Sequence, residues 1–152
     1  MRVLGAILVA SLLSACAGKA VDPSLDAEAK LFRAQSDKAC MYVLPSSRVS
    51  TVTIFMDGKK VGTLGAGDYL RLDVAPGTHV LYVMRPSPLP SFAREKKNDL
   101  TIAAEAGRCY FLRTAWKTVD EVLQEFHLYL EEVPAGEGQQ AVNTRWLVPP
   151  EK

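Results

Sequence analysis

Two histidines, with nearby carboxylates, are the side chains of this chain that could do acid–base chemistry. His79 follows a Pro-Gly turn, and Asp68 or Asp73 could orient its ring as half of a catalytic dyad. A hydrolase also needs a nucleophile within reach of the base, and no nucleophile stands at motif spacing from either histidine. We therefore expect His79 to bond a neighbouring backbone group, and His127 to be exposed on the polar side of a late strand.

The remaining polar patterns are also weak signals for catalysis. Glu131 and Glu132 are adjacent, and neighbours on a strand point to opposite faces, so they cannot share one substrate proton. The Gly-rich stretch at 62–67 lacks the lysine and the following helix of a phosphate-binding loop, and it is typical of a hairpin connection. The sequence therefore predicts that the protein is not an enzyme and that it needs no cofactor.

The N-terminal segment has a different character. Arg2 is followed by an apolar run of 11 residues from Val3 to Leu13, and then by small residues before Cys16. A helix that spans a bilayer needs ~20 apolar residues, so this run is too short to cross. One positive charge, a short apolar run and small residues form the layout of a bacterial secretory signal peptide.

The end of that segment, Leu13-Ser14-Ala15-Cys16, resembles the bacterial lipoprotein signature. The resemblance implies attachment of diacylglycerol to Cys16 through a thioether, cleavage before Cys16 and acylation of the new amino terminus. Three acyl chains, each worth ~0.8 kcal/mol per buried methylene, anchor a domain firmly. Ala17 follows where an Asp would resemble an inner-membrane retention signal, which favours the outer membrane, facing the periplasm. The alternative is an ordinary secretion signal with a chance cysteine.

Once Cys16 is lipidated, Cys40 and Cys109 remain. An even number of cysteines in an exported protein indicates a disulfide, and two unpaired, buried thiols are the alternative. If their strands are neighbours, the Cα atoms come within the ~4.4–6.8 Å that a disulfide requires. With two histidines elsewhere they make a poor zinc site, because structural zinc takes four ligands, so we expect no metal.

The composition bounds the size and the partners of the exported part. Removal of residues 1–15 leaves 137 residues, enough for one domain, with 17 basic and 17 acidic side chains. A neutral chain has no electrostatic reason to bind nucleic acid or an anionic bilayer. We expect the membrane to be reached through the lipid alone.

From Cys40 onward the chain has short apolar runs split by turn signals. Asp57-Gly58 is a type I′ hairpin pair between two β-rich arms. A two-residue turn there predicts the facing pairs Met56–Lys59, Ile54–Val61 and Val52–Thr63, with Val52, Ile54, Met56 and Val61 on the core face.

The next strands follow the same alternation. In the segment 69–74, Leu70, Leu72 and Val74 are expected inward, and the segment 78–84 is expected to return as its partner. A short helix from Asp22-Pro23 would place residues on one face (Ala27, Lys30, Leu31 and Ala34), and another helical segment is expected near the C-terminus. About seven short strands without long helices between them predict an all-β fold, an antiparallel β-sandwich.

This organisation predicts four parts of the chain. They are a signal peptide at 1–15, a membrane tether at 16–38, the β-sandwich domain at 39–145 and a flexible tail at 146–152.

The stretch from Cys40 to about Val142 resembles the DUF2846 family of bacterial lipoprotein domains, relatives in style of PEGA β-sandwich modules. The matching features are the hairpin at 57–59, the Tyr69 strand, the turn at 76–79 and the strand entry at 107–110. The resemblance implies a small exported β-sandwich of unknown biochemical function, with no catalytic residues to carry over. The chain departs from that pattern in a proline-rich, basic loop at 85–98 and at Cys109.

Two functions remain open from the sequence. The first is a structural or interaction module that displays loops and an edge strand to an envelope protein or the cell wall. The second is a periplasmic carrier or sensor of a small apolar ligand held between the sheets, which would need an open cavity. The basic loop residues Arg94, Lys96 and Lys97 could contact a partner, although most such charge runs are only solvated.

Overall fold

The structure is a computed structural model that describes residues 22–47, 51–85, 99–120 and 125–151. These residues form two helices, α1 (Pro23–Ala29) and α2 (Ala135–Asn143), and nine strands. The strands are β1 (Ala39–Leu44), β2 (Thr51–Met56), β3 (Lys59–Gly65), β4 (Asp68–Val74), β5 (Gly77–Met84), β6 (Leu100–Ala104), β7 (Cys109–Asp120), β8 (Glu125–Glu132) and β9 (Trp146–Val148).

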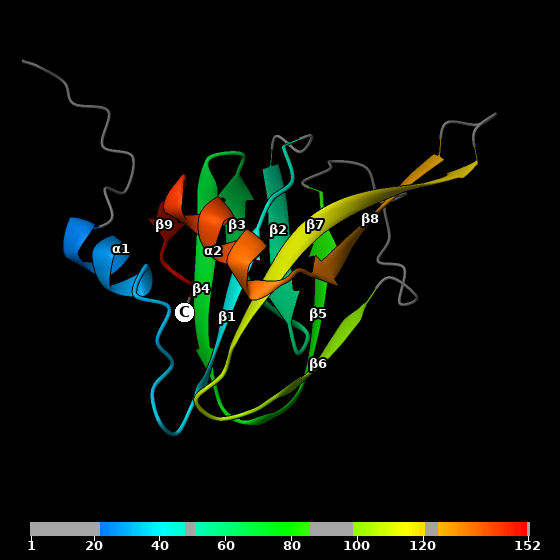
Figure 1. The fold of residues 1–152 in the computed structure, drawn as a ribbon. Coiled ribbons are helices and arrows are strands. Elements are labelled where there is room, and N and C mark those ends of the chain that lie inside the picture. The colour runs from blue at the N-terminus through cyan, green and yellow to red at the C-terminus, as the bar shows by residue number, and fades with distance from the viewer. Residues whose placement is uncertain (1–21, 48–50, 86–98, 121–124, 152) are drawn as a thin grey trace, which may run out of the picture.

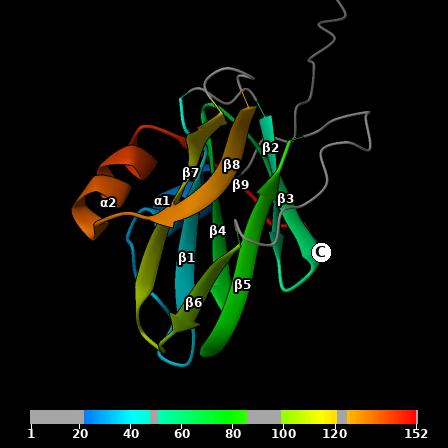
Figure 2. The same cartoon turned by 90° about the vertical axis from the view of Figure 1, so that its right-hand side faces the viewer.

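The strands form two sheets that face one another (Figures 1 and 2). One sheet has the order β8-β7-β1-β4-β9 and the other has the order β3-β2-β5-β6. The predicted β-sandwich, with a short helix before the first strand and another near the C-terminus, is confirmed. The sheets are not wholly antiparallel, however, because β1 pairs with β7 and β4 pairs with β9 in parallel. Long connections separate these partners, and only a long connection allows two strands to run in the same direction.

The β2–β3 hairpin turns at Asp57-Gly58 as predicted, and both turn residues have positive φ angles, 51° and 81°. Met56 faces Lys59, but the rest of the predicted register is wrong: Ile54 faces Gly62 and Val52 faces Leu64. The register shifts between Ile54 and Phe55 because β3 carries one extra residue at that point, a β-bulge. A bulge does not change which residues of β2 are inward, so Val52 and Ile54 are both fully buried, as expected.

The predicted pairing of segment 69–74 with segment 78–84 is also wrong. β4 lies in the five-stranded sheet and β5 in the four-stranded sheet, so the turn between them is a corner of the sandwich. Gly77 takes a φ of 138° at this corner, a value that favours glycine. The stretch at 62–67 likewise leads from β3 into β4 of the other sheet and is not a hairpin within one sheet. Alternation shows which face of a strand is buried, but it does not select the neighbouring strand.

The inner core lies between the two sheets and contains the residues that were expected inward from β4, Leu70, Leu72 and Val74. Their partners come from both sheets and are nearly all apolar. The other members are Ala39, Met41, Val43, Val52, Ile54, Val61, Leu64, Leu81, Ile102, Ala104, Tyr110, Leu112 and Leu130.

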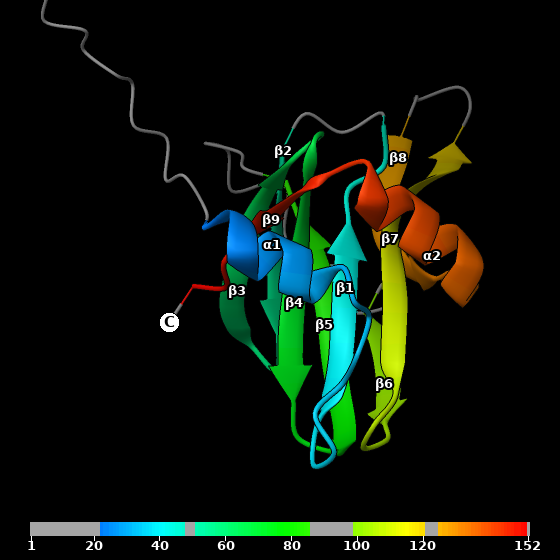
Figure 3. The same ribbon diagram turned by 60° about the vertical axis from the view of Figure 1, so that its left-hand side comes forward.

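A second core covers the outer face of the five-stranded sheet. All six residues of β1 are buried, so β1 is covered on both faces. Figure 3 shows α1 lying over β4 and α2 beside β7 on this outer face. The second core contains Ala29, Cys40, Tyr42, Leu44, Tyr69, Phe111, Val133, Val142 and Leu147. The molecule therefore has three layers, with the two helices as the third.

Residues on both sides of the predicted domain, 39–145, are folded against it. The predicted tether contains α1, which Asp22 caps by accepting a hydrogen bond from the Ser24 N–H, and Ala29 of this helix is buried in the second core. Ala27, expected on the packed face, is exposed. The predicted flexible tail contains β9, which pairs with β4. Both segments pack on the outer face of the five-stranded sheet, where Ala29 and Leu147 are buried in the second core. The sequence pattern predicts one core between two sheets and does not include this second one.

Candidate functional site

Two of the sequence-predicted sites fall outside the described residues. Cys16 precedes residue 22, and the loop residues Arg94, Lys96 and Lys97 lie between 85 and 99. Their proposed roles in lipidation and partner contact therefore stay predictions.

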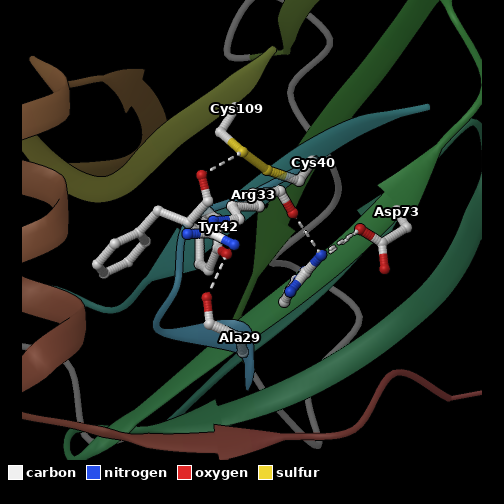
Figure 4. The surroundings of a disulfide bond; sticks show 8 residues. Ala29, Arg33, Cys40, Tyr42, Asp73 and Cys109 are labelled. Atoms are coloured by element: carbon white, nitrogen blue, oxygen red, sulfur yellow. Dashed lines mark hydrogen bonds and ion pairs between the residues drawn. A yellow bond between two sulfur atoms is a disulfide. The ribbon is translucent and has the colours of Figure 1, made fainter. Parts of the chain in front are cut away.

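Cys40 and Cys109 face one another in the parallel pair β1–β7, and a disulfide joins them (Figure 4). Their Cα atoms are 4.5 Å apart. Of the two alternatives, cross-link or separate buried thiols, the structure contains the cross-link. Sγ of Cys109 lies 3.5 Å from the carbonyl oxygen of Phe32, and this is a packing contact because a disulfide sulfur carries no hydrogen. The bond links two strands that no short turn connects.

Aromatic rings pack near this disulfide in the second core. Tyr42 stacks on Phe111 with 5.0 Å between ring centroids, and Phe32 meets Tyr42 edge-on at 5.5 Å. The Tyr42 hydroxyl donates to the carbonyl of Ala29 in α1 at 2.6 Å, and burial raises the pKa of Tyr42 to about 12. A hydroxyl that stays protonated and bonded to a helix carbonyl holds α1 in place; it does not supply a reactive group.

His79 does meet a carboxylate, but the carboxylate is Asp57 and not Asp68 or Asp73. Nδ1 of His79 is 2.7 Å from Oδ2 of Asp57, and Nε2 is 2.9 Å from the carbonyl oxygen of Ala75. The bond to the Ala75 carbonyl agrees with the prediction that His79 bonds a neighbouring backbone group. The Asp57 contact arises because the β2–β3 turn lies against the start of β5. Since both ring nitrogens face acceptors, both must donate, and the ring is an imidazolium in this arrangement.

The pKa values of this pair shift toward the charged forms. Partial burial acts to lower the pKa of His79, but the hydrogen bonds to Asp57 and Ala75 and the Asp57 charge raise it above its usual 6.5. Partial burial acts to raise the pKa of Asp57, yet the hydrogen bonds from His79 and the Val80 N–H and the His79 charge bring it below 3.8. A ring that donates from both nitrogens has no lone pair for a substrate proton, so this pair is not arranged as a general base.

The predicted exposure of His127 is wrong, because only 8% of its surface is accessible. The alternation in β8 is real, since Leu130 is in the inner core and Leu128 packs against it. Alternation assigns side chains to the two faces of a strand, but it does not show what covers the second face.

Glu131 and Glu132 do not converge on one point. Arg113 of β7 donates to Oε1 of Glu131 at 2.7 Å, and it also binds Glu137 of α2. Glu132 is exposed. Arg113 therefore pairs with Glu131 across the two strands and links α2 to the sheet through Glu137, and the two adjacent glutamates have different surroundings.

Sequence reasoning missed Asp26, a carboxylate that is 8% exposed. Its Oδ1 accepts hydrogen bonds from the Tyr69 hydroxyl at 2.9 Å and the Leu147 N–H at 3.0 Å, and its Oδ2 accepts from Lys30 at 2.7 Å. Burial acts to raise the pKa of Asp26, but these hydrogen bonds and the Lys30 charge bring it below its usual value. An Asp in the first turn of a helix is common, because its charge is favourable near the helix N-terminus. Nothing in the sequence therefore distinguished Asp26 as the centre of a buried hydrogen-bond network.

The sequence predicts an exposed edge strand but does not indicate which strand it is; in the structure, β6 is such a strand. Among the described residues, β6 has a neighbour on one side only, β5 (Figure 2). Its sequence, Leu-Thr-Ile-Ala-Ala, carries no charge and no proline. Natural edge strands usually carry such residues because they block pairing with other chains.

The hydrogen bonds of β5 show which backbone groups of β6 point outward. The Val80 N–H donates to the Asp57 carboxylate and the Val80 carbonyl accepts from the Asp57 N–H, both at 2.9 Å, so the backbone of Val80 points toward β2. Val80 faces Thr101 in β6, so Thr101 belongs to a pair without mutual hydrogen bonds. The N–H and C=O of Thr101 therefore point to the open edge, as does the backbone of Ala103, whose carbonyl accepts from Tyr110 at 2.9 Å.

The other edges of the sheets differ from β6. At β3, the Val61 carbonyl accepts from the Glu151 N–H at 2.9 Å, and Lys60 pairs with Glu151. The β8 edge carries three glutamates, and β9 has only three residues. Within the described part of the chain, β6 is therefore the edge best suited to accept another strand.

No three or more His, Cys, Asp or Glu side chains gather in a metal-binding arrangement in residues 22–47, 51–85, 99–120 and 125–151. Neither helix of those ranges has the length and apolar character needed to cross a bilayer.

Comparison with curated proteins gives no significant match. A family model described as a protein of unknown function (DUF2846) matches residues 35–125, the region from before β1 to the start of β8. This region contains both cysteines of the disulfide, the His79–Asp57 pair and the β6 edge, whereas α1, α2 and β9 lie outside it. Because the match covers more than half of the chain, the protein belongs to the DUF2846 family.

Proposed function

We propose that this protein is a lipid-anchored protein of the bacterial cell envelope, held at the outer membrane through Cys16 and facing the periplasm. Its β-sandwich acts as a non-catalytic interaction module. The module binds an envelope protein that adds an extended segment to β6 as a further strand.

The observation that carries the binding role is the edge of β6. Thr101 directs both backbone groups outward, and Ala103 directs its N–H outward, so a partner strand can form hydrogen bonds along the edge. The side chains of Thr101 and Ala103 are exposed, while Ile102 between them is buried in the inner core. The strand is thus fixed to the domain by one face and has an open edge at Thr101 and the Ala103 N–H, whereas the Tyr110 hydroxyl occupies the Ala103 carbonyl and the Glu105 N–H.

Three observations support the other parts of the proposal. The signature ending at Cys16 supports the lipid anchor. The disulfide between Cys40 and Cys109 suits an oxidising compartment such as the periplasm. The occupied ring nitrogens of His79 support a role without catalysis.

The inner core favours this module over a carrier of an apolar ligand. Side chains from both sheets, such as Ile54, Leu64 and Leu112, are fully buried and belong to one continuous cluster. A continuous cluster of buried apolar side chains from both sheets is typical of the interior of a stable domain.

The anchor is tested by Cys16→Ser. This substitution should abolish labelling by a radioactive fatty acid and release the protein from membranes, because no other segment is expected to hold it there. Cys109→Ser, which changes a cysteine without a predicted lipid, is the matched control and should keep the label. Label that persists on Cys16→Ser would contradict the anchor.

The partner edge is tested by Thr101→Pro, which removes an outward N–H but no hydrogen bond to β5. Cross-linking in intact envelopes should capture a protein with the wild type and with Thr101→Val, which keeps the N–H. Thr101→Pro should lose that capture while its melting temperature stays within a few degrees of wild type.

The same assay separates the rival contacts. Deletion of residues 86–97 tests the basic loop, and His79→Ala tests catalysis in a folded protein. If the loop deletion abolishes capture and Thr101→Pro does not, the partner binds the loop and not β6. Capture of cell-wall glycan alone would also contradict strand addition.

A further inference from the structure

The large apolar side chains that are exposed among the described residues lie in two neighbouring parts of the molecule, α1 with the turn that follows it and β9. They are Leu25 in α1, Leu31 just after α1 and Trp146 in β9, with 49%, 57% and 71% of their surfaces accessible. Single exposed apolar residues are common on soluble proteins, but here α1 contacts β9 directly. We call these three residues the apolar rim.

The geometry keeps the rim together. Leu25 lies in α1, and Leu31 lies two positions after Ala29, the last residue of that helix. Lys30 lies next to Leu31, and its Nζ is 5.5 Å from the centroid of the Trp146 ring. The same ammonium group binds Asp26 at 2.7 Å and the Arg145 carbonyl at 2.8 Å, so Lys30 joins the end of α1 to the start of β9. Figure 3 shows α1 and β9 on the same side of the molecule, next to β4.

The position of the rim relative to Cys16 limits its distance from a membrane. Asp22, the residue that caps α1, lies six positions after Cys16. A chain of that length reaches at most ~21 Å when fully extended. If Cys16 carries acyl chains, the N-terminus of α1 must stay within that distance of the bilayer surface, and a tether this short raises the effective concentration of the rim at the bilayer into the mM range.

We propose that the apolar rim seats on the phospholipid bilayer that holds the lipid of Cys16, with the Trp146 ring in the interfacial region. This inference rests on the proposed lipid anchor. Tryptophan favours the interface because its ring is apolar while its N–H is polar, and the leucine side chains favour the boundary of the acyl chains. The side chains flanking the rim have both signs of charge, Lys30 and Arg33 against Asp22 and Glu28, so the seating needs no anionic lipid.

Seating would orient the domain. With α1 and β9 toward the membrane, the four-stranded sheet lies on the side of the molecule away from α1, as Figure 1 shows. The open edge of β6 would then face the periplasm, where a partner can reach it.

The test uses the full-length protein, purified with its lipid and reconstituted into phosphatidylcholine–phosphatidylethanolamine vesicles with brominated acyl chains, which quench nearby tryptophan. The chain has two tryptophans, so Trp116→Phe leaves Trp146 alone, and Trp146→Phe leaves Trp116, which packs against the inner core. The lipid should quench the Trp146-only protein and leave the Trp116-only protein unquenched. Leu31→Ser combined with Leu25→Ser should float with the vesicles and lose most of the Trp146 quenching.

Flotation separates the two proposals. If the wild type does not float, the lipid anchor fails and the seating falls with it. If it floats and Trp146 is unquenched, only the seating is overturned. Protection of Trp146 from acrylamide in native envelopes, but not in vesicles, would assign the rim to a protein partner instead. If Trp116→Phe does not fold, the difference in quenching between the wild type and Trp146→Phe reports the same contact.

Discussion

The carboxylate of Asp26 accepts a hydrogen bond from the backbone N–H of Leu147, 3.0 Å away and 121 positions along the chain. This one contact joins the first helix to the last strand. The same oxygen accepts from the Tyr69 hydroxyl of β4. Asp26 therefore connects α1, β4 and β9, the elements that close the outer layer over the five-stranded sheet.

Asp26→Ala should lower the free energy of unfolding by about 2–3 kcal/mol, because the Leu147 N–H and the Tyr69 hydroxyl lose their acceptor in a buried place. Asp26→Asn, which keeps one acceptor oxygen, should cost less. Denaturant unfolding gives the size of the effect, and amide hydrogen exchange at Leu147 should become faster in the Ala variant. Unchanged exchange at Leu147 would show that β9 is held in another way.

Two glycines of α2 provide a matched pair. A Cβ on Gly138 would overlap the Phe111 side chain, whereas a Cβ on Gly136 would meet no atom within 4 Å. Gly138→Ala should therefore destabilise the domain by about 1–3 kcal/mol through overpacking. Gly136→Ala should stabilise it by up to about 0.5–1 kcal/mol, since alanine favours helix. Thermal melting of both variants checks the prediction, and equal effects would mean that α2 does not pack on β7 as described.

The Cys40–Cys109 bond closes a loop with a sequence separation of 69 residues. In the chain-entropy model such a cross-link contributes up to ~4 kcal/mol by restricting the unfolded chain. Protein purified without reductant should have a mass two protons below that of the dithiol form. Reductant should lower the unfolding midpoint of the wild type and leave a Cys40→Ala/Cys109→Ala variant unaffected. Two thiols that alkylate freely in the non-reduced protein would refute the bond.

The His79–Asp57 pair predicts a pH dependence of stability. The pKa of His79 is raised, so its contribution is complete below about 6.5 and disappears as the pH rises through the folded-state value. The pKa of Asp57 is lowered, so its contribution is complete above about 3.8 and disappears as the pH falls through the folded-state value. The pair should therefore stabilise most between these two limits.

His79→Ala should accordingly cost more stability near pH 5.5 than near pH 8.5, by less than about 1 kcal/mol, because 45% of the Asp57 side chain is exposed and solvent screens the pair. Urea unfolding at both pH values measures the difference. A cost that does not change with pH would show that His79 contributes through packing alone.

Local patterns in the sequence predicted the strands well, because alternation and turn residues act over a few positions. Asp57-Gly58 turns the chain where expected, and Leu70, Leu72 and Val74 lie inward. The same patterns could not place β4 and β5 in different sheets. Either neighbour would bury the same face, so the choice depends on how the whole chain closes.

The candidate sites divide in the same way. The pairing of Cys40 with Cys109 was predicted from residue type and number alone, and the lipid on Cys16, predicted from residue type and order, stays a prediction. The partner of His79, the burial of His127 and the open edge of β6 could not be read, because each depends on what lies across space from the residue.

By itself, the sequence determined an all-β domain, because hydrophobic periodicity is a property of the chain alone, and the export segment at 1–15 stays a prediction. The tertiary structure decided that the ends of the domain fold back as α1 and β9. The outer face of β1 and β4 carries Cys40, Tyr42 and Tyr69, and these side chains are removed from water only when α1, α2 and β9 cover them. That requirement appears only after β1 and β4 are adjacent in one sheet, which no local pattern specifies.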